Sequence, residues 1–179
     1  MKAPERVETQ RLILRKPGRD DADAIFAGYA SDPEVTRLLG WPRHTSLEVT
    51  RSFLEFCELE WGRSPAGPYL IESRNDGLLI GSTGLAFETP SRAATGYVLA
   101  KDAWGKGYAT EALRAVTNIA RDVGVVRLYA LCHPDNPASW HVLEKCGFSR
   151  EGLLRAHTEF PNLGSDGPGD VLCYAVVLR

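Results

Sequence analysis

Residues 98–112 read VLAKDAWGKGYATEA, and this stretch decides how the rest of the chain is interpreted. An extended run ends near residue 100, and Trp104-Gly105-Lys106-Gly107 leads directly into an amphipathic helix predicted to begin near Tyr108. Glycines let the backbone turn tightly and approach a ligand closely. The first amides of a helix have no partner within it, and with the helix dipole they favour an anion. The stretch therefore predicts either a phosphate-binding loop, with Lys106 adding positive charge, or only a tight strand-to-helix turn.

Two familiar phosphate-binding motifs do not match this loop. A Walker A motif needs Ser or Thr after Gly-Lys and a Gly five positions before the second Gly, where this chain has Gly107 and Ala100. A dinucleotide fingerprint needs a third Gly at position 110, where the chain has Thr110. The sequence therefore argues against a nucleotide-binding oxidoreductase.

Composition favours one ordinary globular domain spanning residues 1–179. The chain is 44% apolar, and its 21 basic and 23 acidic residues give a net charge of −2. This apolar content with so low a net charge excludes disorder. The balanced charge gives no reason to expect nucleic-acid or membrane partners. The longest apolar run, residues 171–178, is too short to cross a bilayer, and no apolar segment follows the first residues as in a secretory signal. We expect a cytoplasmic protein without a metal site, whose cysteines are free thiols without zinc-ligand spacing: Cys57, Cys132, Cys146 and Cys173.

Periodicity along the chain predicts alternating strands and helices. Helices are expected at 20–29, 33–40, from 46–48 onward, 108–123 and 136–147, and the third should bury Val49, Phe53, Phe56 and Leu59. Strands are expected at 11–16, 69–72, 78–82 into 85–87, 96–100, 127–132, 148–154 and 171–178, with a turn at 75–77 and a loop at 162–170. This order predicts a mixed α/β or α+β single domain.

A second stretch, residues 133–148, reads HPDNPASWHVLEKCGF, and residues 9–15 read TQRLILR. Together with WGKGYATEA, these segments resemble the GNAT superfamily of acyl-CoA-dependent N-acetyltransferases, and more narrowly the RimJ/RimL branch that acetylates N-terminal amines of proteins. The resemblance implies a single GNAT-like domain with a central mixed, mostly antiparallel sheet flanked by helices. It also implies acetyl-CoA as cosubstrate and suggests a homodimer.

The resemblance assigns a set of cofactor-binding residues. Family members bind the coenzyme A pyrophosphate on the amides of an Arg/Gln-x-x-Gly-x-Gly/Ala loop, and here Trp104 stands in place of the usual Arg or Gln. The strand before the loop is expected beside the pantetheine arm, with the Leu99 amide at the acetyl carbonyl, where a donor can stabilise an oxyanion. The matching positions are Tyr97, Val98, Leu99, Trp104, Gly105, Lys106, Gly107, Tyr108, Ala109 and Thr110.

Two polar residues at the start of the helix at 136–147 have two interpretations each. Asn136 matches a family residue that binds the pantetheine arm, and it also stands at an N-cap position before Pro137. Ser139 resembles the group that protonates the departing thiolate, or is a first-turn hydroxyl without a role. Many family members place a Tyr acid where this chain has Leu143, so no Tyr is expected to act as the acid and Ser139 is the preferred candidate.

The general base is the open question. Ala94 stands where the branch often carries a Glu. The candidates are Glu88, His133, His157 and Glu159, although a lone His is often structural and a loop Glu is often only solvated.

The acceptor class is also open between a protein or peptide N-terminal amine and a small amine such as an amino acid, a polyamine or an antibiotic. Glu88 and Trp41 are the candidate acceptor contacts, with simple packing as the alternative for Trp41. A non-catalytic acyl-CoA-binding domain is the competing class of function.

Overall fold

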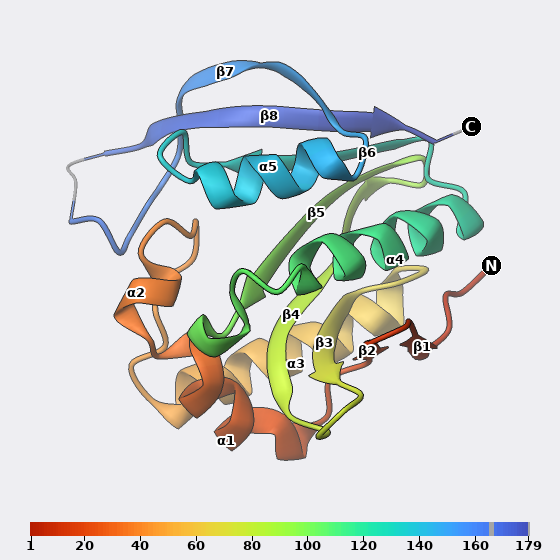
Figure 1. The fold of residues 1–179 in the computed structure, drawn as a ribbon, viewed down its shortest axis with the longest axis vertical. Coiled ribbons are helices and arrows are strands. Elements are labelled where there is room, and N and C mark those ends of the chain that lie inside the picture. The colour runs from red at the N-terminus through yellow and green to blue at the C-terminus, as the bar shows by residue number, and fades with distance from the viewer. Residues whose placement is uncertain (165–166, 179) are drawn as a thin grey trace.

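The computed structural model describes residues 1–164 and 167–178, so the predicted loop at 162–170 lies partly outside the described residues. The elements form one ordered series along the chain (Figure 1). They are β1 (Arg6–Glu8), β2 (Leu12–Arg15), η1 (Arg19–Asp21), α1 (Ala22–Ile25), η2 (Phe26–Ala30), α2 (Pro33–Thr36), α3 (Leu47–Arg63), β3 (Pro68–Ser73), β4 (Leu79–Thr89), β5 (Arg92–Leu99), η3 (Lys101–Ala103), α4 (Tyr108–Asp122), β6 (Arg127–Cys132), α5 (Pro137–Lys145), β7 (Ser149–Thr158) and β8 (Gly169–Val177).

One eight-stranded sheet in the order β1-β2-β3-β4-β5-β6-β8-β7 forms the centre of the molecule. Neighbouring strands are antiparallel except β5 and β6, the one parallel pair in the described part of the sheet. Helices α4 and α5 lie on one face, and α1 and α3 cover the other face of the N-terminal half (Figure 1). The predicted mixed, mostly antiparallel sheet flanked by helices is confirmed.

Side-chain alternation divides the core between the two faces of the sheet. Tyr69 and Ile71 belong to the larger apolar cluster beneath α4, whereas Leu70 between them belongs to the smaller cluster beneath α1 and α3. In the same way Leu99 faces α4 and Val98 faces the opposite layer. Because successive side chains of a strand point to opposite faces, each of these strands packs against α4 on one face and against α1 and α3 on the other.

Helix α4 forms where the sequence predicts it. Gly107 adopts a left-handed conformation with φ +78° immediately before the first helical residue, a geometry that favours glycine. The predicted apolar stripe is buried against the sheet, including Leu113, Val116 and Ile119. Among the described residues, every helix is too short or too polar to span a lipid bilayer.

The predicted buried face of α3 is wrong. The helix buries Thr50, Leu54, Cys57, Glu60 and Trp61. In the expected stripe one position earlier, only Phe53 is partly buried, whereas Val49, Phe56 and Leu59 are exposed, Leu59 to 68%. The sequence carries two adjacent apolar stripes at helical spacing, and periodicity alone cannot select between them. The stripe that is buried includes Thr50, whose hydroxyl lies 2.9 Å from Nδ1 of buried His44.

Several element boundaries also differ from the prediction. Helix α2 ends at Thr36 rather than at residue 40, because the chain turns at residues 37–38. Strand β5 begins at Arg92, four residues early, since its first residues pair with the distant β6. Strand β7 continues to Thr158, through register shifts and a positive φ at Ala156. The two strand differences come from pairing with other strands, which local patterns do not contain.

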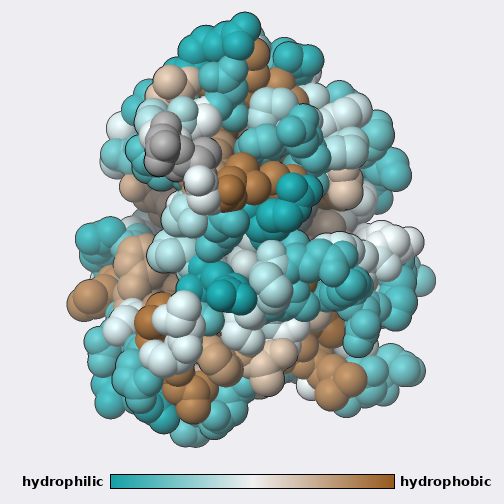
Figure 2. Space-filling model, turned by 90° about the vertical axis from the view of Figure 1, so that its left-hand side faces the viewer, coloured by the Kyte–Doolittle hydropathy of each residue, from teal (hydrophilic) through white to brown (hydrophobic). Residues whose placement is uncertain are grey.

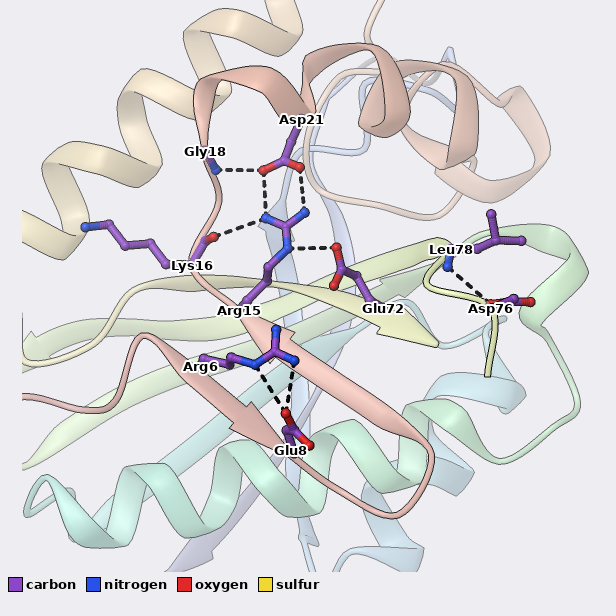
Figure 3. Close-up of polar contacts among 9 residues, drawn as sticks. All are labelled: Arg6, Glu8, Arg15, Lys16, Gly18, Asp21, Glu72, Asp76 and Leu78. Atoms are coloured by element: carbon purple, nitrogen blue, oxygen red, sulfur yellow. Dashed lines mark hydrogen bonds and ion pairs between the residues drawn. The ribbon is translucent and has the colours of Figure 1, made fainter. Parts of the chain in front are cut away.

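A partly buried ion-pair cluster fixes the entry to α1 (Figure 3). The Arg15 guanidinium of β2 donates to Asp21 at 2.6 and 2.8 Å and to Glu72 of β3 at 2.7 Å. Asp21 also accepts the Gly18 amide at 2.7 Å. Burial alone would raise the pKa of Asp21, but the hydrogen bonds from Arg15 and Gly18 together lower it. The cluster thus joins two strands to the first helical turn of the chain.

Candidate active site

The central feature of the site is a cleft formed where β5 and β6 separate. The two strands pair only from Arg92 to Ala94 and from Arg127 to Tyr129. Beyond these residues they diverge, and residues 95–99 and 130–132 line opposite walls of a cavity of about 1050 Å³. The N-terminal turn of α5 closes the β6 side, and the loop before α4 closes one end. The structure thus gives one continuous cleft through the middle of the sheet.

Backbone alternation directs the Leu99 amide into this cleft. The next amide, Ala100, donates to Ile80 of β4 at 2.8 Å, and Val98 forms the register pair with Ser82. Because successive residues of a strand point their N–H groups to opposite sides, the Leu99 amide points away from β4, toward the side where β6 has departed. The Leu99 carbonyl lies on the same side and accepts the Trp104 indole N–H at 2.9 Å. The wall therefore offers a hydrogen-bond donor in the middle of the cleft.

The loop between β5 and α4 fits an anionic group. Gly105 and Gly107 both adopt left-handed conformations, with φ +72° and +78°, and a Cβ added at Gly105 would meet nothing within 4 Å. The loop therefore leaves open space at the end of the cleft, and the first amides of α4, at Tyr108, Ala109 and Thr110, have no partner within the helix. Such an arrangement suits a pyrophosphate bound by main-chain amides.

A Tyr that sequence reasoning did not expect near Ser139 ties the two walls together. The Tyr97 hydroxyl, on β5, donates to the Ser139 carbonyl at 2.6 Å and lies 3.2 Å from the Ser139 hydroxyl. Burial raises the pKa of Tyr97, so the phenol stays protonated at neutral pH. This Tyr comes from β5, a different element from the helix that carries the family position at Leu143.

Asn136 confirms its capping interpretation. Its side-chain oxygen accepts the Ser139 amide at 3.2 Å, with Pro137 at the first helical position. This cap begins α5 at the cleft and holds Ser139 in the first turn, where both residues line the cavity. One residue thereby sets the direction of the helix that carries the candidate acid.

The candidate bases are not brought together. His133 lines the cleft, packs edge-on against Phe160 at 4.7 Å, and accepts the Asp135 amide on Nδ1 at 3.1 Å. Because Nδ1 already accepts a backbone amide, this nitrogen is not free to take a proton from the acceptor amine. His157 and Glu159 are exposed and do not line the cleft in the described part of the chain.

Glu88 lies away from the cleft, contrary to the expectation that it contacts the acceptor or acts as base. It accepts the Tyr129 hydroxyl and pairs with Arg92 at 2.6 Å, at the end of β5 opposite Leu99. Arg92 and Leu99 are seven positions apart on this strand, a span of about 23 Å. The Tyr129 hydrogen bond, with Arg92 beside it, lowers the pKa of Glu88, which further weakens it as a base.

Trp41 lines the same cavity as the glycine loop, and it packs on the face of the sheet that carries Val98. We call this region the aromatic end, and it consists of Leu38, Leu39, Trp41, Phe53 and Phe56. The buried His44 ring packs between Trp41 and Phe53, at centroid distances of 5.4 and 6.0 Å. Trp41 therefore both lines the cavity and packs against neighbours. On the molecular face that carries α2, apolar residues are exposed in separate patches among hydrophilic ones (Figure 2).

Asn162 joins this end to the connection between β7 and β8. Its amide nitrogen donates to the carbonyls of Thr36 and Trp41 at 2.8 and 2.9 Å, and its side-chain oxygen accepts the Arg43 amide at 2.9 Å. We call these three bonds the Asn162 latch. No local signal identifies it, because its partners lie 119 to 126 residues away.

The described residues contain no group of three or more His, Cys, Asp or Glu side chains placed to hold a metal ion. Cys132 lines the cleft, and burial raises its pKa to about 11, so its thiol stays protonated at neutral pH.

Comparisons with known proteins agree with this geometry. The family model "Acetyltransferase (GNAT) domain" matches residues 11–149. The uncharacterized N-acetyltransferase YoaA of Bacillus subtilis is 34% identical over 154 residues, covering 84% of this chain and 86% of that protein.

Solved structures of the same fold include coenzyme A complexes. RimL, a ribosomal L7/L12 α-N-protein acetyltransferase in complex with coenzyme A, superposes with a TM-score of 0.85 at 26% identity, covering 97% of this chain and 98% of that one. An acetyltransferase of Salmonella typhimurium that modifies the N-terminal serine of L7/L12 has a TM-score of 0.83 at 25% identity, covering 96% and 97%. The chain therefore belongs to the GNAT family and is an acetyl-CoA-dependent N-acetyltransferase.

Proposed function

We propose that this enzyme acetylates the N-terminal α-amine of a protein or peptide, as a RimJ/RimL-like member of its family. The observation that carries the proposal is the opposition of the Leu99 amide and Ser139 across one cleft, which the glycine loop and the aromatic end also line. Two structural neighbours whose names state N-terminal acetylation of a ribosomal protein support this acceptor class.

The proposed cofactor site follows the cleft from the glycine loop to Ser139. Amides of the loop and of the first turn of α4 hold the pyrophosphate, at Trp104, Gly105, Lys106, Gly107, Tyr108, Ala109 and Thr110. The strand residues Tyr97, Val98 and Leu99 lie along the pantetheine arm, with Asn136 opposite. Acetyl-CoA supplies the activated acetyl thioester.

The proposed chemistry is direct transfer. The acceptor nitrogen forms a bond to the acetyl carbonyl carbon, the carbon–sulfur bond breaks, and the amine proton leaves to water. The Leu99 amide donates to the carbonyl oxygen as negative charge develops on it. Ser139 donates a proton to the departing sulfur and regains one from water, so that the protons balance over the cycle. A covalent route through Cys132 is disfavoured, because a buried thiol that stays protonated is a poor nucleophile.

The same proposal places the enzyme in the cytoplasm. Its four cysteines are free thiols, as a reducing compartment favours.

The test is release of coenzyme A thiol with two acceptor panels. One panel holds peptides with free N-termini, each paired with the same peptide N-terminally blocked but carrying an internal Lys. The other holds amino acids, polyamines and amine antibiotics. We expect turnover only on free N-termini, with the acetyl group located there by mass spectrometry. Turnover confined to small amines would replace the proposed acceptor class, and turnover on blocked peptides would assign a Lys acceptor.

A further inference from the structure

Arg11, in the turn between β1 and β2, reaches across to the glycine loop. Its Nη1 donates to the Lys106 carbonyl at 2.8 Å, and its Nε donates to Glu111 of α4 at 2.7 Å. The guanidinium carbon lies 4.7 Å from the centre of the Tyr108 ring. A Cβ added at Gly107 would lie 3.4 Å from Arg11 Nη2, so the guanidinium stands directly behind this glycine. One side chain therefore contacts the glycine loop and two residues in the first turn of α4.

Glu111 completes the connection from the helix side. Its carboxylate, with a side chain only 16% exposed, accepts the Thr9 hydroxyl at 2.6 Å and the Arg11 backbone amide at 2.8 Å. Burial by itself would raise the pKa of Glu111, but the hydrogen bonds from Thr9 and Arg11 lower it. Because the carboxylate stays ionised, it balances the Arg11 charge and fixes the guanidinium plane.

The Lys106 contact determines where the next amide points. In a trans peptide the C=O and N–H groups point in opposite directions. The carbonyl of the Lys106–Gly107 peptide points at Arg11, so the Gly107 N–H points away from it, to the opposite side of the loop. Arg11 thus holds one peptide plane at the helix N-terminus in a single orientation.

We propose that Arg11 is a positioning residue for acetyl-CoA, which orients the Gly107 amide and the start of α4 toward the pyrophosphate. This inference rests on the proposed placement of the pyrophosphate on the glycine loop. Since Glu111 neutralises Arg11, the residue acts through geometry rather than through its charge. Preorganised donors increase affinity because binding no longer has to order them.

The test compares acetyl-CoA with S-acetylpantetheine, which keeps the thioester but lacks the pyrophosphate. For Arg11→Met we expect the KM for acetyl-CoA to rise about tenfold, with kcat changed less than about twofold. The kcat/KM for S-acetylpantetheine should stay within about twofold of the parent. Arg11→Lys should recover part of the loss, because Lys can pair with Glu111 but cannot make both hydrogen bonds.

Arg74→Met is the matched control. Arg74 is as exposed as Arg11, with 44% of each side chain accessible, and it donates to the Thr9 carbonyl at 2.7 Å without touching the loop. This variant should keep kcat/KM for acetyl-CoA and for S-acetylpantetheine within about twofold of the parent. If Arg11→Met proves unstable, Glu111→Gln should shift the acetyl-CoA KM in the same direction.

Three outcomes are distinguishable. Equal losses on both thioesters would mean that Arg11 only stabilises the fold and would overturn the inference. An unchanged KM for acetyl-CoA in Arg11→Met would also overturn it. If the unmodified enzyme bound acetyl-CoA and S-acetylpantetheine equally well, the placement of the pyrophosphate itself would be wrong.

Discussion

At the residue scale, the Tyr97 hydroxyl joins β5 to the first turn of α5, because it hydrogen-bonds Ser139 across the cleft. Because Tyr97 donates its own proton to the Ser139 carbonyl, its oxygen is left to accept a hydrogen bond from the Ser139 hydroxyl, which restrains the rotation of that hydroxyl. We predict that Tyr97→Phe lowers kcat about tenfold with the KM for acetyl-CoA little changed, since the acid loses its orientation. Steady-state kinetics with an acceptor found by the two-panel assay measures both constants.

Ser139→Ala provides the comparison for this prediction. It should lower kcat about a hundredfold and keep coenzyme A affinity, because only the proton donor is removed. The double variant should be no slower than Ser139→Ala alone, since Tyr97 acts through Ser139. A double variant whose losses multiply would show that Tyr97 acts independently of Ser139.

The sequence predicted residues on both walls of this site but not the hydrogen bond that joins them. The glycine loop and the Asn136 cap carry local signals, whereas Leu99 and Ser139 were expected from the resemblance to the family. The bond between Tyr97 and Ser139 depends on how far β5 and β6 diverge, which no local pattern records. Glu88 was expected near the acceptor but lies away from the cleft. An acidic residue at a strand end gives no indication of which end of the sheet it occupies.

The Asn162 latch belongs to the scale of elements, because it joins the loop after α2 to the connection after β7. We predict that Asn162→Ala raises the KM for the acceptor about fivefold and leaves the KM for acetyl-CoA unchanged, because Trp41 loses its anchor at the aromatic end. Loss of three hydrogen bonds should also lower the free energy of unfolding by about 2 kcal/mol. Two-substrate kinetics and urea denaturation measure these effects.

Asn118→Ala is the control for this prediction. Asn118 lies on α4, where its side chain accepts only an exposed bond from Arg121 in the described residues. Neither KM should change. Should Asn162→Ala raise both KM values together, the latch would serve the fold as a whole rather than the aromatic end.

The sequence predicts that α3 is a helix, but it does not predict which side of the helix is buried. The stripe of Val49, Phe53 and Phe56 is at least as apolar as the one that is buried, which includes Thr50. Packing against α1 and β3 decides between them. As a result Phe53 and Phe56 line the cleft.

At the scale of the whole molecule, the Arg15–Asp21–Glu72 cluster makes stability depend on pH (Figure 3). We predict that Asp21→Asn lowers the free energy of unfolding by about 2 kcal/mol at neutral pH. The folded pKa of Asp21 is lowered, so its ionised form stabilises the fold above the unfolded pKa of about 3.9. That contribution is lost as pH falls through the lower folded pKa, so the difference between variant and parent should shrink below about pH 4.

Thermal melts of parent and variant between neutral and acidic pH provide the measurement. The neighbouring exposed Asp20 supplies the control, because Asp20→Asn should leave the melting temperature nearly unchanged at every pH. A difference between Asp21→Asn and its parent that stayed constant down to the lowest pH would contradict the role of ionised Asp21.

The brief parallel pairing of β5 with β6 leaves two edge strands facing each other inside one molecule. Exposed edges normally attract a further strand, which elsewhere leads to aggregation. Here the Leu99 edge lies within a cleft, where an extended ligand can add to the sheet as a strand would. Acetyl-CoA bound between β5 and β6 would then connect the two halves of the sheet. The gap between these strands would serve both catalysis and ligand-dependent stability of the fold.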